Sequence, residues 1–247
     1  MNKLNDLVSW FADKNKVMIA LSGGVDSAVV AYAAFRALGN SAIAVTADYK
    51  TLSEEELFSA KQVCSEIGIK QIFLDYSELE NKEFVKNDSN RCFHCRMELG
   101  EHLVELAKKH EVKIIVDGTN LDDLGDYRPG IDAAKQYGVR SPLVEAELTK
   151  EDIRTLSKDM GLEVWDKPAQ ACLSSRIPYG TTVTVEALTR IAKAEHFLRS
   201  KGFKQIRVRH HDSIARIEVN PSDLGDFIAE PLRSEINDEF KKIGYSY

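Results

Sequence analysis

Four short apolar runs in the first half of the chain alternate with segments of helical periodicity. The runs are Val17–Leu21, Ala42–Ala47, Gln71–Leu74 and Lys113–Val116. Strands buried on both faces read as continuous apolar runs, and strands separated by helices pair in parallel. The alternation therefore predicts an α/β fold in which a Rossmann-like parallel sheet is covered by helices.

Two of the expected helices carry clear start signals. Ser53 begins a capping box ahead of an apolar stripe that contains Cys64, so we expect Cys64 to be buried. Thr149 begins a second helix that ends at Gly161. Beyond this helix comes a loop rich in Pro, Ser and Gly, followed by an expected helix and hairpin. We therefore place the domain boundary just before the helix. Residues 1–147 form the first expected domain and residues 148–247 a smaller α+β domain.

Charge and hydropathy narrow the possible partners. Lys plus Arg number 33 and Asp plus Glu number 39, a net charge of −6, which disfavours non-specific attraction to nucleic-acid phosphates. The longest apolar run is far shorter than the ~20 residues of a membrane-spanning helix. Residues 1–21 lack the long apolar core and the cleavage site of a signal peptide. We expect a cytoplasmic protein without a membrane or nucleic-acid partner.

The hexapeptide Ser22-Gly23-Gly24-Val25-Asp26-Ser27 directly follows the first expected strand. Glycines allow a tight turn close to a ligand, and the N–H groups at the start of the next helix favour a bound phosphate. The hexapeptide has neither the Lys-Ser or Lys-Thr pair of P-loop ATPases nor the dinucleotide-binding glycine spacing. It predicts an anion site; the alternative is an ordinary glycine-rich turn capped by Asp26 or Ser27.

The last part of the chain predicts a helix from about 184 to 200 and a hairpin of strands 205–210 and 214–219. The alternation places apolar side chains on one face of the hairpin and charged side chains on the other. The charged residues are Arg207, Arg209, Arg216 and Glu218. This charged face is either a solvated outer surface or a binding site.

The four cysteines are too few for a disulfide scaffold. Cys92 and Cys95 form a C-x-x-C at the start of an expected helix, and Cys172 stands alone in a loop. A redox dithiol would normally follow a thioredoxin-type strand, and a four-ligand zinc site lacks a second pair. Three thiolates, Cys92, Cys95 and Cys172, can instead bind three irons of a [4Fe-4S] cluster and leave the fourth iron open for sulfide.

The hexapeptide resembles the pyrophosphate loop of the ATP-pyrophosphatase superfamily, whose members cleave ATP between the α and β phosphates and activate an oxygen as its adenylate. Further segments resemble the LarE family of ATP-dependent sulfur transferases, over almost the whole chain. These segments are Asp117–Asn120, Asp122–Asp123, Asp126–Gly130, Lys167–Ala169, Cys172–Gly180, Arg207–His210 and Ala215–Glu218.

The resemblance implies a two-step reaction with ATP and Mg²⁺ as cofactors. One carboxylate of pyridinium-3,5-biscarboxylic acid mononucleotide is adenylated, and sulfur from sulfide or another donor then replaces the activated oxygen. The product is a precursor of the nickel-pincer nucleotide of lactate racemase. We also expect a homo-oligomer.

The resemblance also implies roles for particular residues. Pyrophosphate is assigned to a loop site whose residues are Ser22, Gly23, Gly24, Asp26, Ser27 and Gly118, and Asp26 is in addition a candidate Mg²⁺ ligand. Arg207 and Arg209 are candidates for the substrate phosphate.

Three further residues have open roles. Glu195 and Glu218 are candidate metal ligands. Glu218 could instead orient Arg207 and Arg209, and Glu195 could equally reach water or pair with Arg199. Arg176 is expected either to stabilise a Cys172 thiolate or the acyl phosphate, or to form a surface ion pair.

The sulfur source and the enzyme class each have an alternative. One branch of the LarE family gives up the sulfur of the single cysteine that matches Cys172, and another branch carries the additional C-x-x-C and looks cluster-dependent. The presence of Cys92 and Cys95 favours the cluster. A tRNA-thiolating enzyme and a nucleotide-sensing module are the competing functions, and the net charge of −6 disfavours the first.

Overall fold

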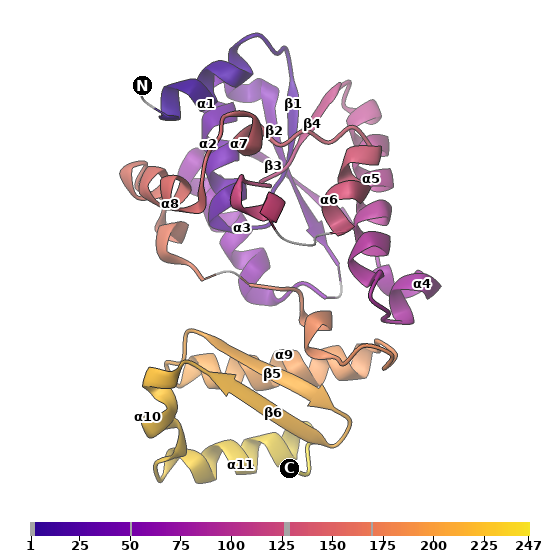
Figure 1. Cartoon of the computed structure of the whole chain (residues 1–247), viewed down its shortest axis with the longest axis vertical. Helices are drawn as coiled ribbons and strands as arrows, with labels where there is room; N and C mark the ends of the chain where they lie inside the picture. Colours follow the sequence, from indigo (N-terminus) through magenta and orange to yellow (C-terminus); the bar gives the residue numbers. More distant parts are fainter. Residues whose placement is uncertain (1–2, 50, 126–128, 169) are drawn as a thin grey trace. The chain divides into compact units, whose positions relative to one another are not determined.

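The four apolar runs form one parallel sheet, shown in Figure 1. The computed structural model describes residues 3–49, 51–125, 129–168 and 170–247. The strands are β1 (Val17–Ala20), β2 (Ala42–Asp48), β3 (Lys70–Asp75) and β4 (Ile114–Val116). Their order is β3-β2-β1-β4, and all pairs are parallel. The predicted α/β class with a Rossmann-like parallel sheet is confirmed.

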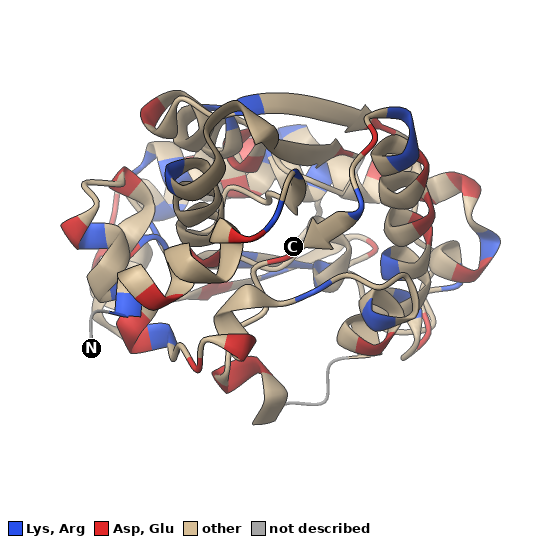
Figure 2. Cartoon of the chain, turned by 90° about the horizontal axis from the view of Figure 1, so that it is seen from above, with Lys and Arg blue, Asp and Glu red and all other residues tan. Residues whose placement is uncertain are grey.

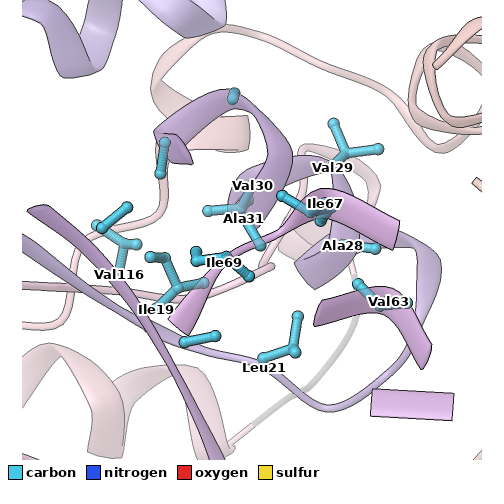
Figure 3. Close-up of a cluster of buried hydrophobic side chains, with 14 of the residues drawn as sticks. Ile19, Leu21, Ala28, Val29, Val30, Ala31, Val63, Ile67, Ile69 and Val116 are labelled. Carbon is cyan, nitrogen blue, oxygen red and sulfur yellow. The ribbon is translucent and has the colours of Figure 1, made fainter. Parts of the chain in front are cut away.

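Helices cover both faces of this sheet. One face packs against α1 (Lys3–Ala12), α2 (Val25–Leu38), α3 (Glu54–Ile67) and α8 (Lys150–Asp159). The other face packs against α5 (Arg91–Lys109). Figure 2 shows charged residues of both signs along the helices. Figure 3 shows the apolar side chains that β1, α2 and α3 place between them.

Three shorter helices complete the helical segments up to residue 145. They are α4 (Lys82–Val85), α6 (Pro129–Gln136) and α7 (Pro142–Glu145).

The capping residues predicted at the starts of α3 and α8 form the expected hydrogen bonds. The Ser53 hydroxyl accepts from the Glu56 N–H and the Glu56 carboxylate accepts from the Ser53 N–H. Thr149 and Asp152 form the same reciprocal pair at α8. Each box satisfies N–H groups that a helix start leaves without an intrahelical partner. Cys64 lies on the buried side of α3 and is 5% exposed, as predicted.

The chain divides into two compact units, at positions that differ from the expected boundary. Unit 1 contains Met1–Glu78 and Cys92–Gln170, and unit 2 contains Leu79–Arg91 and Ala171–Tyr247. Helix α8 stays with unit 1 because its Ile153 is fully buried in the core that α2 shares. The expected break before Thr149 is therefore about twenty residues too early.

The segment Leu79–Arg91 joins unit 2 through the buried side chain of Asn87. Its Nδ2 donates to the carbonyls of Pro178 and Thr181, each at 2.8 Å. The Asn87 carbonyl accepts from the Gly180 N–H at 2.9 Å. These bonds fasten the segment to a loop about ninety residues later in the chain.

Unit 2 is an antiparallel hairpin with helices around it. Strands β5 (Ile206–His211) and β6 (Ile214–Val219) pair in the register Arg207 opposite Glu218 and Arg209 opposite Arg216. The helices are α9 (Val185–Ser200), α10 (Leu224–Ile228) and α11 (Leu232–Ile243). The apolar face of the hairpin packs on α9 and α11, so the predicted α+β character and two-faced hairpin are confirmed.

None of the helices that the structure describes has both the length and the hydropathy to span a lipid bilayer. The cytoplasmic location and the homo-oligomer remain predictions.

Candidate functional site

The hexapeptide forms the turn between β1 and α2, at the carboxyl edge of the sheet. Its hydroxyl groups bond within the loop: Ser27 Oγ donates to the Gly24 carbonyl at 3.1 Å and accepts from the Ser22 N–H at 3.2 Å. The two hydroxyl oxygens, of Ser22 and Ser27, are 3.3 Å apart. The two hydroxyls and the N–H groups at the start of α2 therefore come from the same turn.

Two glycines allow this turn to fit against its neighbours. Gly23 has φ +76°, and a Cβ there would lie 2.7 Å from the Ala60 nitrogen in α3. A Cβ on Gly118, in the loop after β4, would lie 2.7 Å from the Ser27 nitrogen. Side chains at these positions would clash with backbone, which explains why the sequence has glycine at both.

The amino end of α2 has the features of an anion site. Gly24 is its N-cap residue and supplies no side chain to the N–H groups of the first turn. The macrodipole of this 14-residue helix adds a partial positive charge at the same end. The turn lies between β1 and β4, neighbouring strands whose connections diverge, which is where open α/β sheets bind ligands.

Asp26 in the first turn of α2 is held by two partners. Asn120 Nδ2 donates to its carboxylate at 3.1 Å, and Lys150 Nζ forms an ion pair with it. Lys150 is at the start of α8, where the helix dipole disfavours a positive charge, and the Asp26 carboxylate offsets this. A metal ion at Asp26 would share the carboxylate with Lys150 or displace it.

In unit 2, Cys172 is half-buried and begins a short 3-10 turn, Leu173–Arg176. Its Sγ lies 2.9 Å from the Ser174 Oγ. Arg176 donates to the carbonyls of Ala171 and, at 3.1 Å, Cys172. The guanidinium therefore fixes the backbone on which the Cys172 thiol is carried.

Arg176 is itself held by a buried ion pair. Its Nε and Nη2 donate to the two oxygens of Glu195 at 2.8 and 3.0 Å, and neither side chain is more than 2% exposed. Arg199 and the Val208 N–H also donate to Glu195. Charged groups at such depth persist because every oxygen is hydrogen-bonded. The expected pair of Glu195 with Arg199 is present, and the surface ion-pair alternative for Arg176 is wrong because this pair is buried. The role of Glu195 as a metal ligand stays a prediction.

On the charged face of the hairpin, two arginines share the carboxylate of Glu218, and a third arginine has no partner among the described residues. Arg209 forms a two-pronged pair with Glu218, at 3.0 and 2.9 Å, and also donates to the Ser175 carbonyl. Arg216 donates to the same carboxylate. The hydrogen bond from Arg209 lowers the pKa of Glu218. Glu218 thus orients Arg209, one of its two expected roles, and its role as a metal ligand stays a prediction.

Arg207 is exposed, and among the described residues it has no hydrogen bond or ion pair. Its guanidinium is the part of this face that is free to bind an anion.

Cys92 and Cys95 lie in the first turn of α5, in unit 1. Cys92 is exposed, Cys95 is half-buried, and neither is in a disulfide. Cys64 lies in the core of unit 1, and burial raises the pKa of its thiol to about 12. Within the described residues of either unit, no three His, Cys, Asp or Glu side chains are grouped as a metal site.

Two of the segments that suggested the resemblance are only partly within the described residues. Asp126, Tyr127 and Arg128 lie outside them, as does Ala169.

Comparisons with known proteins decide the family. The NAD synthase family model matches residues 2–103. The chain is 34% identical over 244 residues to a pyridinium-3,5-bisthiocarboxylic acid mononucleotide synthase of Lactiplantibacillus plantarum, covering 98% of this chain and 87% of that protein. The chain belongs to the LarE family. It is an ATP-dependent sulfur transferase of the pyrophosphate-loop class.

Two other relatives show how far this similarity extends. An uncharacterised protein of Synechocystis is 43% identical over 246 residues, which are 100% of this chain and 92% of that protein. A tRNA-specific 2-thiouridylase of Wolbachia pipientis is 25% identical over 63% of this chain and 52% of its own length. The tRNA-thiolating enzyme is thus a distant relative.

Sequence reasoning missed the contacts of Lys150 and Ser59 at the pyrophosphate loop, and it placed Lys167 only in a segment that resembles the family. Lys150 binds Asp26, while Ser59 and Lys167 both donate to the Gly23 carbonyl. Two signals in the sequence pointed to Ser59 and Lys150. A serine on the buried stripe of a helix requires a polar partner, and a lysine in a first helical turn opposes the dipole.

Proposed function

We propose that this LarE protein adenylates one carboxylate of pyridinium-3,5-biscarboxylic acid mononucleotide with ATP and then replaces the activated oxygen with sulfur. The thiocarboxylate product is a precursor of the nickel-pincer nucleotide of lactate racemase. The observation that carries the proposal is the similarity to the Lactiplantibacillus synthase, which extends over 98% of this chain and 87% of that enzyme.

Adenylation is needed because a carboxylate oxygen is a poor leaving group and AMP is a far better one. In the proposal, the departing pyrophosphate occupies the turn between β1 and α2. The hydroxyls of Ser22 and Ser27 and the N–H groups of Gly24 and Asp26 stabilise its charge. Asp26 would be a ligand of Mg²⁺, which would neutralise part of the phosphate charge, and Lys150, now paired with this carboxylate, would add a positive charge beside it.

The phosphate of the mononucleotide is assigned to the charged face of the hairpin. Arg207 supplies a guanidinium without a partner among the described residues, and its forked donors suit phosphate oxygens. Arg209 is oriented by Glu218 and by the Ser175 carbonyl, so it adds a fixed positive charge on the same strand.

The sulfur is assigned to a [4Fe-4S] cluster held by Cys92, Cys95 and Cys172. Cys92 and Cys95 lie three residues apart on α5 and are not in a disulfide, and neither is Cys172, whose loop is fixed by Arg176. These are donors of the type that such clusters require. With three protein ligands, such a cluster would have one iron available to sulfide. Arg176 acts by holding the Cys172 carbonyl and thus the position of the thiol.

The experiment is a product analysis with ATP, Mg²⁺, sulfide and each candidate acceptor. The proposal expects AMP and pyrophosphate to form only with the pyridinium mononucleotide, together with the thiocarboxylate detected by mass spectrometry. AMP formation that depends on tRNA would instead support the thiouridylase alternative. Absence of AMP with every acceptor would contradict the transferase.

A further inference from the structure

The carbonyl group of Gly23 receives two hydrogen bonds from outside the pyrophosphate loop. Ser59 Oγ in α3 donates to it at 2.8 Å, and Lys167 Nζ donates at 3.0 Å. Ser59 is 8% exposed. A serine inside a helix commonly bonds the carbonyl four residues earlier. The Ser59 hydroxyl instead reaches a peptide 36 residues earlier in the chain.

This bond fixes the orientation of the peptide between Gly23 and Gly24. A trans peptide points its C=O and N–H in opposite directions, so a carbonyl held against α3 aims the Gly24 N–H away from α3. Among the described residues, that N–H makes a long hydrogen bond, 3.4 Å, to the Ser22 Oγ, so the N–H stays largely available to a ligand. Because Gly24 is the N-cap residue of α2, its N–H lies at the helix end that favours an anion.

Neither glycine can hold this orientation by its own conformational preference. Glycine has no Cβ and occupies positive and negative φ about equally, so an unsupported Gly-Gly peptide rotates freely. The backbone of α3 lies directly behind the loop, since a Cβ on Gly23 would be 2.9 Å from the Glu56 carbonyl. Helix α3 is therefore the rigid wall against which the peptide is fixed.

We propose that Ser59 is a positioning residue for the pyrophosphate: it holds the Gly23–Gly24 peptide so that the Gly24 N–H faces the phosphate. The proposal rests on the pyrophosphate-forming reaction proposed above. Ser59 has a short side chain on a rigid helix and sets the orientation, whereas Lys167 has a long side chain and contributes mainly charge.

The proposal is tested with Ser59→Ala, and Ser65→Ala is the matched control because Ser65 is exposed on the same helix. Alanine is the better helix former, so the substitution does not weaken α3 itself. Calorimetry measures the binding of two separate probes, inorganic pyrophosphate with Mg²⁺ and adenosine. Because one oriented hydrogen bond is lost, the Ser59→Ala variant should bind pyrophosphate about five- to tenfold more weakly than the wild type.

We expect adenosine binding to be unchanged in Ser59→Ala, and both probes to be unchanged in Ser65→Ala. Ser59→Thr, which keeps the hydroxyl, should restore pyrophosphate binding. An equal loss for both probes would show a general structural effect and overturn the proposal, as would undiminished pyrophosphate binding. If the wild-type protein itself binds no pyrophosphate, the proposed function fails rather than the role of Ser59.

Discussion

The Ser27 side chain, in the loop after β1, offers a test of whether the protein releases AMP and pyrophosphate from ATP. Ser27 is 4% exposed, and its hydroxyl belongs entirely to the loop, between the Ser22 N–H and the Gly24 carbonyl. In the proposed reaction the hydroxyl would turn its one proton from the Gly24 carbonyl to a phosphate oxygen as charge develops there.

Ser27→Ala should therefore slow adenylation on the order of 10²- to 10³-fold, the loss seen when one oriented donor is removed from an oxyanion site. The measurement is single-turnover release of AMP from labelled ATP in the presence of the mononucleotide. Release of ADP in place of AMP would show that the loop serves a different phosphate cleavage.

Replacing Arg207 tests whether the charged face of the hairpin binds the substrate phosphate, and Arg216 on the same face is the control. Arg207→Ala should raise the KM for the mononucleotide about tenfold or more, because a charge-assisted bond to phosphate is lost, while the KM for ATP stays constant. Arg216 lies on the same face but pairs with Glu218 and is 63% exposed. Arg216→Ala should leave both constants unchanged. Identical kinetics in both variants would make the charged face a solvated surface.

At the scale of elements, the buried pair of Arg176 and Glu195 joins the Cys172 turn to α9 and β5. Breaking such a pair by removing one partner costs about 3–5 kcal/mol, because the remaining charge is left in the interior. Arg176→Met should cost about 3 kcal/mol of unfolding free energy, at the low end, since Arg199 and the Val208 N–H still reach Glu195.

Urea denaturation measures this loss. The control is Lys242→Ala, which removes an exposed pair with Glu239 and should cost less than about 0.5 kcal/mol. Equal losses in the two variants would contradict the structural importance of the buried pair.

His210 on β5 gives unit 2 a pH-dependent stability. Burial lowers the pKa of His210 from its usual 6.5, with a further contribution from Arg190. The unfolded chain therefore binds a proton at a higher pH than the folded chain does. Stability from this group is complete above 6.5 and is lost as the pH falls toward the folded pKa.

His210→Phe should therefore reduce the fall in thermal midpoint between about pH 7.5 and about pH 5. The substitution also removes the 3.1 Å bond to the Tyr245 hydroxyl, so the midpoint at high pH should be lower. The informative quantity is the difference between the two pH values. A variant whose midpoint falls as steeply as the wild type would show that other groups cause the acid sensitivity.

These elements also show which features a sequence reveals. The capping boxes of α3 and α8 and the turn after β1 were predictable, because each is formed by residues close together in the chain. The division into units was not, because it depends on Ile153 packing in the α2 core and on Asn87 bonding a loop about ninety residues away. The Lys150–Asp26 pair was hidden for the same reason, since its members are 124 residues apart.

Across the whole molecule, the chemistry-bearing residues are divided between the two units. Unit 1 contains the pyrophosphate loop and the C-x-x-C, and unit 2 contains Cys172 and the arginines assigned to substrate. A LarE protein with a single cysteine would be consumed in one turnover, because its own polypeptide supplies the sulfur. In the proposed function, the additional thiols of this chain, Cys92 and Cys95, would hold the cluster that makes repeated transfer possible.

Iron and sulfide analysis of the wild type and of cysteine variants tests this sulfur source. Protein prepared without oxygen should be brown, and iron and acid-labile sulfide should both be lost when Cys92, Cys95 or Cys172 is replaced by Ala. Cys64→Ala should keep both, because that thiol is buried in the α3 core and burial raises its pKa to about 12.

Intact-protein mass after reaction with ATP, the mononucleotide and sulfide separates the two routes. If the cluster delivers sulfide, turnover leaves the chain mass unchanged, because no sulfur is taken from the polypeptide. If Cys172 is sacrificed, its Cβ–Sγ bond breaks and dehydroalanine remains, so the chain becomes lighter by one H₂S. Such a loss at Cys172, together with iron-free but active protein, would overturn the cluster assignment and leave the adenylation chemistry untouched.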